Sequence, residues 1–179
     1  MVINGFTFIS RLQVWTQPLW LLLHSLPFIF IAANHSYLFG EWTHYTGILG
    51  NPEGNFDLLL FGAASAVLFS LSAQIGEQVD FLRFLPPKTK DNAKAWWISL
   101  LSAGPGWIVV GGLKIFVGSF LLFVCLKFLM PVEMATEPSY MYHTAFNFVF
   151  ASSWIAALVA ATFVIISQIK INVTNAYAG

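Results

Sequence analysis

The chain has 179 residues, of which 58% are hydrophobic, 17% aromatic and only 9% charged, and its net charge is zero. A soluble domain of this length could not bury so much apolar surface, and such domains carry about 25% charged residues. The composition also excludes a disordered chain and a nucleic-acid-binding protein, and a single cysteine, Cys125, excludes a disulfide scaffold. The remaining class is an all-α integral membrane protein.

Four stretches with few charges predict about four transmembrane helices. Together they form a single membrane domain that covers residues 1–179. In chain order they are about residues 14–33, 58–78, 106–128 and 144–170. A helix needs about 20 apolar residues to cross a bilayer. Between the second and third spans, Lys88, Lys90 and Lys94 accompany a short apolar run. This pattern predicts an interfacial amphipathic helix over about residues 92–102.

The distribution of basic residues predicts how the helices are oriented. Residues 83–94 hold four of the eight Lys and Arg residues, whereas residues 34–57 and 130–143 hold none. Cytoplasmic loops carry an excess of Lys and Arg, so we expect residues 83–94 on the cytoplasmic side. With four spans, both termini are then cytoplasmic, and the expected location is the cytoplasmic (inner) membrane.

Polar residues gather in the second half of the second span. Ser70, Gln74 and Glu77 fall at helical spacing and share one face. A run of small residues, 62–66, precedes them. One interpretation is a discontinuous helix that surrounds a ligand. The other is a tight packing face whose hydroxyls bond back to their own helix carbonyls.

The last span also ends in polar residues. Gln168, Asn172 and Asn175 share one face, and Lys170 lies roughly 160° around the helix from Gln168 or Asn172. An amide offers a donor and an acceptor side by side, which suits the edge of a planar heterocycle. The alternative is an interfacial cap with a snorkelling lysine.

Candidates for chemistry are few elsewhere. His24 lies between Pro18 and Pro27, where it would either bond a carbonyl freed by a proline or relay protons. No nucleophile with a base, no phosphate-binding loop and no metal-ligand spacing is present. We therefore expect neither an enzyme nor a bound cofactor or metal.

Three motifs resemble a known family of transporters. They are an Asp-Phe-x-Arg run from Asp80 to Arg83 after a small-residue-rich helix, the opening at residues 9–18, and the tail at residues 172–179. In order and spacing they are similar to helices five to eight of the cytosine/purine permease group of the nucleobase–cation symporter family. The resemblance implies part of a LeuT-like inverted-repeat fold, a nucleobase-like substrate, and the missing helices of the same transporter as partners.

The resemblance also implies the roles of individual residues. Residues expected to contact the substrate are Ser70, Leu71, Ser72, Gln74, Ser167, Gln168 and Asn172. Asp80 and Arg83 would be structural or gating charges at the cytoplasmic end. For Glu77, the alternatives are proton coupling and pairing with Arg83 or Lys88.

The family's coupling sodium usually contacts hydroxyls of helix eight just before the Asn. The corresponding residues here are Lys170 and Ile171, neither of which carries a hydroxyl. We therefore expect the ammonium of Lys170 to replace the ion and uptake to be independent of sodium. Proton coupling is the alternative to sodium, because a buried lysine readily changes its protonation state.

Two other functions remain open at the level of sequence. The first is a transporter-like membrane module of a sensor or signalling protein, which residues downstream of Gly179 would reveal. The second is a self-standing four-helix membrane protein with a binding or structural role. It would be a stable, ligand-binding product when expressed alone.

Overall fold

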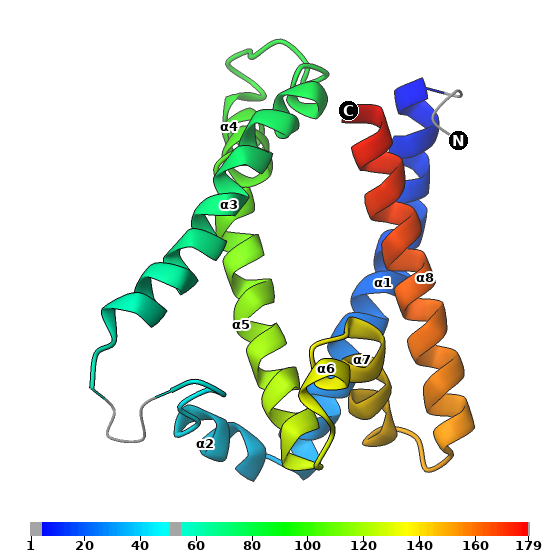
Figure 1. Cartoon of the computed structure of the whole chain (residues 1–179). Coiled ribbons are helices and arrows are strands. Elements are labelled where there is room, and N and C mark those ends of the chain that lie inside the picture. The colour runs from blue at the N-terminus through cyan, green and yellow to red at the C-terminus, as the bar shows by residue number, and fades with distance from the viewer. Residues whose placement is uncertain (1–4, 51–54, 179) are drawn as a thin grey trace. The chain divides into compact units, whose positions relative to one another are not determined.

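Every regular element in the described part of the chain is an α-helix (Figure 1). The computed structural model describes residues 5–50 and 55–178. The four longest helices are α1 (Gly5–Asn34), α3 (Leu58–Leu82), α5 (Gly106–Lys127) and α8 (Ser153–Ala178). The shorter helices are α2 (Tyr37–Thr43), α4 (Ala93–Ala103), α6 (Val132–Ala135) and α7 (Pro138–Asn147). The all-helical prediction is confirmed for these residues.

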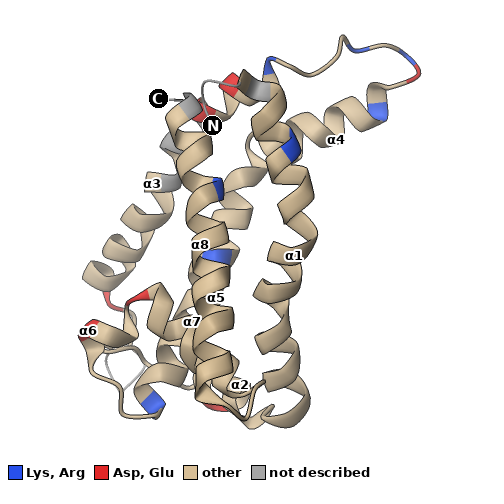
Figure 2. Ribbon diagram, turned by 90° about the vertical axis from the view of Figure 1, so that its right-hand side faces the viewer, with Lys and Arg blue, Asp and Glu red and all other residues tan. Residues whose placement is uncertain are grey.

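Three helical segments are long and apolar enough to cross a membrane. They are Thr7–Asn34, Gly106–Lys127 and Ser153–Ala176, and they support the predicted membrane location. Figure 2 shows that the long helices carry few charged residues, whereas the loop between α3 and α4 carries several. In α3 the apolar stretch among the described residues is shorter, Leu58–Ser70. The fourth span and the LeuT-like arrangement therefore stay predictions.

The last predicted span differs from the structure at its beginning. Residues 144–147 belong to α7, and α8 begins only at Ser153. The turn between them is closed by hydrogen bonds from Phe148 N–H to Ala145 O (3.2 Å) and from Phe150 N–H to Phe146 O (2.9 Å). The sequence does not mark this break, because residues 148–151 are as apolar and uncharged as the interior of a span.

A short helix, α4, lies within one residue of each predicted bound of the interfacial segment. It ends at Ala103, and after a corner at Gly104 and Pro105 the next helix, α5, begins at Gly106. A Cβ atom at Gly104 would lie 2.8 Å from the Leu100 carbonyl oxygen, so the corner accepts only glycine there. The position of α4 at a membrane surface stays a prediction.

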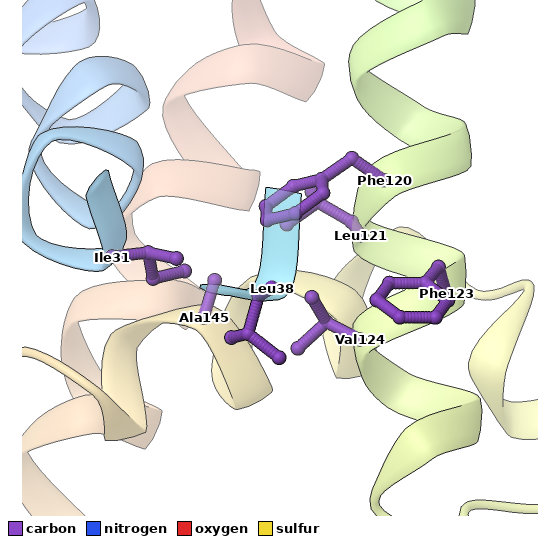
Figure 3. Packing of buried hydrophobic residues seen from close by; sticks show 7 residues of the cluster. All are labelled: Ile31, Leu38, Phe120, Leu121, Phe123, Val124 and Ala145. Carbon is purple, nitrogen blue, oxygen red and sulfur yellow. The ribbon is translucent and has the colours of Figure 1, made fainter. Parts of the chain in front are cut away.

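The chain divides into two compact units, which are described separately. The first comprises residues 1–45 and 119–179, and the second comprises residues 46–118. In the first unit α1 and α8 run side by side in opposite directions, and α7 packs against both (Figure 1). Figure 3 shows the buried cluster that joins α1, α2, α7 and the end of α5: Ile31, Leu38, Phe120, Leu121, Phe123, Val124 and Ala145.

In the second unit, α3 begins at a capping aspartate. One carboxylate oxygen of Asp57 accepts hydrogen bonds from Leu59 N–H (2.8 Å) and Leu60 N–H (3.0 Å). These bonds satisfy two of the amide groups that the first helical turn leaves without partners. Further along, Gly112 of α5 lies beside Leu68 of α3, where an added Cβ would come within 3.6 Å of the leucine side chain.

The end of α5 is a Schellman motif with leucine in the left-handed position. Leu129 N–H donates to Leu126 O (3.0 Å), Met130 N–H donates to Cys125 O (3.2 Å), and Leu129 has a φ of 59°. This conformation costs an L-residue roughly 1–2 kcal/mol, whereas glycine adopts it freely.

We expect Leu129→Gly to raise the free energy of unfolding by about 1 kcal/mol. Leu129 is 92% exposed, so removing its side chain loses few packing contacts. Denaturant titration in detergent micelles measures the change. Leu129→Ala is the control, because alanine keeps the left-handed strain. An equal gain in stability for the alanine variant would contradict this explanation.

Candidate functional site

Lys170 is the charged residue that counts as buried among the described residues, since only 9% of it is exposed. It contacts three oxygens of α1: Gln17 Oε1 at 2.9 Å, Gln13 O at 3.2 Å and Thr16 Oγ1 at 3.2 Å. All three are neutral, so the charge is stabilised by dipoles in charge-assisted hydrogen bonds rather than by an ion pair. The side chain therefore fastens α8 to the first half of α1.

Two further hydrogen bonds follow the same helix pair. Gln13 Nε2 donates to the backbone oxygen of Lys170 (3.1 Å), and Trp20 Nε1 donates to Ser167 Oγ (2.8 Å). Because hydrocarbon offers no water as a competing partner, polar side chains between membrane helices pair with each other. Ser167 and Lys170, one turn apart, thus belong to the face of α8 that packs on α1.

An aromatic layer continues from this contact toward α7. The rings of Trp20 and His24 are stacked, with centroids 4.9 Å apart and planes inclined by 6°. Phe163 of α8 lies 6.0 Å from Trp20 and 5.9 Å from His24. His24 Nδ1 lies 2.8 Å from the hydroxyl of Tyr142. This nitrogen thus contacts a tyrosine far along the chain. The two sequence-based alternatives for His24, a bond to a carbonyl freed by proline and a proton relay, stay predictions.

Burial raises the pKa of Tyr142, which lies on α7 outside the candidate spans. The folded protein therefore keeps the phenol proton at pH values where the unfolded chain, with a pKa of about 10, has lost it. Stability from this group is fully present below pH ~10 and is lost as the pH rises through the pKa of the folded state.

We expect unfolding measured between pH ~8 and ~12 to show this loss in the native chain and not in Tyr142→Phe. The difference between the two chains in each buffer isolates Tyr142 from the other groups that titrate in this range. At neutral pH the phenylalanine variant should be about 1 kcal/mol less stable, since His24 Nδ1 loses its partner. Parallel pH profiles for the two chains would contradict the assignment.

On α8 the structure separates the predicted substrate-binding residues into two sets. Ser167 faces α1, where its oxygen accepts the Trp20 proton. Gln168 and Asn172 are exposed and lie one turn apart, roughly 100–160° around the helix from Ser167 and Lys170. An amide in contact with hydrocarbon costs free energy, so this face requires a polar partner: water, another helix or a ligand.

On α3, Ser70 and Ser72 are exposed, while the side chains of Leu71 and Gln74 lie outside the described part of the structure. The hydroxyl of Ser70 donates to Val67 O of its own helix at 2.6 Å. Such back-bonding is the packing interpretation of this run. It still leaves the oxygen of Ser70 able to accept a hydrogen bond.

The charges at the end of α3 form an exposed pair. Arg83 Nη1 lies 3.9 Å from Asp80 Oδ1, three residues earlier, and the guanidinium lies 5.1 Å from the ring centroid of Phe84. Glu77 is exposed one turn before Asp80. Exposed ion pairs contribute about 0–1 kcal/mol to stability. These residues belong to the second unit, and those of α8 belong to the first.

The polar stripe of α1 was not predicted from the sequence. Gln13, Thr16, Gln17, Trp20 and His24 recur at spacings of three and four residues, and this periodicity is the signal that could have identified them. No comparable signal marks Tyr142 as the partner of His24, since 118 residues separate them.

Comparisons with known protein families, with curated proteins and with solved structures find no match. Within residues 5–50 and 55–178, no three His, Cys, Asp or Glu side chains are placed to hold a metal ion. The candidate functional groups are therefore those on the two faces of α8 and, in the second unit, those at the polar end of α3.

Proposed function

We propose that this chain is part of a secondary active transporter that moves a nucleobase or a related heterocycle across the cytoplasmic membrane. Its partners are the substrate, the membrane lipid and further helices of the same transporter. The observation that carries the proposal is the exposed amide pair, Gln168 and Asn172, on an apolar helix whose other face is fastened to α1. The similarity of residues 80–83 and 172–179 to cytosine/purine permeases adds the class of substrate.

Amides at this spacing match the chemistry of a nucleobase. The edge of such a ring alternates hydrogen-bond donors and acceptors, and each carboxamide presents one of each in a plane. Two amides one helical turn apart, about 5–6 Å between Cβ atoms, can contact neighbouring groups of one ring. A ligand of this kind also removes the cost of leaving Gln168 and Asn172 in hydrocarbon.

The resemblance to the permeases also implies substrate contacts from residues of the second unit. Ser70 and Ser72 would supply hydroxyl oxygens, Leu71 and Gln74 would adjoin them, and the Asp80–Arg83 pair would act as a gating or structural charge pair. In the structure α3 is continuous from Leu58 to Leu82, so the discontinuous helix considered at the sequence level is not observed. The small residues before Ser70 still permit close approach of a neighbouring helix.

Lys170 suggests how transport is coupled. Its ammonium occupies a position with three neutral oxygen partners, which is the environment that a bound alkali cation would otherwise require. A cation tethered there makes a mobile sodium ion unnecessary. Protons are then the coupling ion, and Glu77, exposed near the end of α3, is the second candidate for carrying them.

The test is uptake of radiolabelled cytosine, adenine and hypoxanthine by cells that carry the complete transporter. We expect uptake of at least one of these bases, and we expect it to be unchanged when choline replaces sodium. Uptake should fall when a protonophore collapses the proton gradient. Strong sodium dependence would overturn the role of Lys170, and absence of uptake for all nucleobases would overturn the proposed function.

A further inference from the structure

We propose that the loop between α3 and α4, together with α4, binds the headgroup of an anionic phospholipid at the membrane surface. The surface consists of Lys88, Lys90 and Lys94 beside the exposed apolar face of α4. It lies entirely within the second unit. The proposal does not depend on which compound the transporter carries.

This surface carries an excess of positive charge. Residues 88–94 hold three lysines against one acidic residue, Asp91. Lys88, Lys90 and Lys94 are all exposed, and the ion pairs found among the described residues involve other basic side chains. An anionic membrane surface attracts such a cluster by about 1 kcal/mol per lysine.

The loop is held to the start of α4 by side-chain hydrogen bonds. Asn92 Oδ1 accepts from Thr89 N–H (2.7 Å), and Asn92 Nδ2 donates to Pro87 O (3.0 Å). Trp96 Nε1 donates to Pro86 O at 3.0 Å. These bonds tie the loop back onto the first turns of α4, so the lysines are presented close to the helix.

An exposed apolar face lies next to these charges. Trp97, Ile98 and Leu101 are 46%, 58% and 53% exposed and lie on one side of α4. Lys94 precedes Trp97 and Ile98 by three and four residues and shares their side. Lys88 Nζ lies 4.8 Å from the centroid of a Trp97 ring.

The positive charge and the apolar face together indicate that a lipid binds to this surface. With 11 residues, α4 is about 16 Å long and cannot span a bilayer. Lying on the surface, it can insert the face of Trp97, Ile98 and Leu101 among acyl chains while the lysines meet phosphate groups. A nucleic acid or a free anion would satisfy the lysines and leave this apolar face in water.

The experiment is lipid retention by the complete 179-residue chain, measured by native mass spectrometry in detergent with phosphatidylglycerol or phosphatidylcholine. We expect tighter retention of phosphatidylglycerol. The variant Lys90→Gln/Lys94→Gln should lose about fivefold in affinity per lysine, or ~25-fold in total, for this lipid alone. The control Arg11→Gln/Lys114→Gln changes the net charge equally at other sites and should retain the native preference.

Several results would overturn the proposal. One is an equal loss in the control pair, which would mean that only net charge matters. Another is displacement of the lipid by excess inorganic phosphate, which would mean that a free anion is the ligand. A third is retention by this chain that disappears in the complete transporter, which would show that another helix covers α4.

Discussion

Lys170→Ala is expected to lower the free energy of unfolding by about 2–3 kcal/mol. The variant removes three charge-assisted hydrogen bonds, to Gln13 O, Thr16 Oγ1 and Gln17 Oε1, from the contact between α1 and α8. It also removes the Lys170 donor from the oxygens of Thr16 and Gln17. A hydrogen bond between membrane helices contributes about 0.6 kcal/mol on average and up to ~1.7 kcal/mol to stability. The Lys170 ammonium makes three such bonds, so their combined contribution to the free energy of unfolding is large.

Unfolding by sodium dodecyl sulfate in mixed micelles, followed by circular dichroism, measures this effect. Gln168→Ala is the matched control, because it removes a polar side chain from the opposite face of the same helix and should change stability by less than about 0.5 kcal/mol. A double-mutant cycle with Gln17→Ala should give a coupling energy of about 1 kcal/mol between Lys170 and Gln17. Equal effects of Lys170→Ala and Gln168→Ala would refute the role of Lys170 in fastening the two helices.

The second large effect is expected on transport. In the complete transporter, Gln168→Ala and Asn172→Ala should each raise the KM for nucleobase uptake about five- to tenfold, which corresponds to one lost hydrogen bond. The double variant should lose roughly 50-fold if the two contacts are independent. Neither substitution should lower stability in the micelle assay, since both side chains lie away from α1.

Asn147→Ala is the control for this prediction. Asn147 is an exposed amide at the end of α7, outside the candidate spans, and its loss should leave KM unchanged. An unchanged KM in the Gln168→Ala/Asn172→Ala double variant would mean that the amide face of α8 meets another helix instead of the substrate.

The parts predictable from sequence are those that depend on local chemistry. Long apolar runs identify α1, α5 and α8 as helices able to span a membrane, and residues 103–106 mark the corner between α4 and α5. Helical periodicity alone places Gln168 and Asn172 on a different side of α8 from Lys170. In the structure these two amides are exposed, and Lys170 is buried.

The parts that escaped prediction depend on partners far apart in the chain. The oxygens that receive the Lys170 ammonium lie more than 150 residues earlier, on α1. The contact of His24 with Tyr142 likewise joins elements whose packing no local pattern encodes. The division between α7 and α8 was also missed, because an apolar turn and an apolar helix have the same hydropathy.

The two faces of α8 are tested most directly by thiol labelling of the complete transporter in membranes. Cys125 is the free cysteine of the described chain and is buried, so a Cys125→Ala background permits single cysteines elsewhere. Gln168→Cys and Asn172→Cys should react with a maleimide, and a transported nucleobase should slow that reaction. Ser167→Cys, on the face packed against α1, should react slowly with or without the base. Labelling at 168 and 172 that no nucleobase affects would contradict the proposal that this face of α8 binds the substrate.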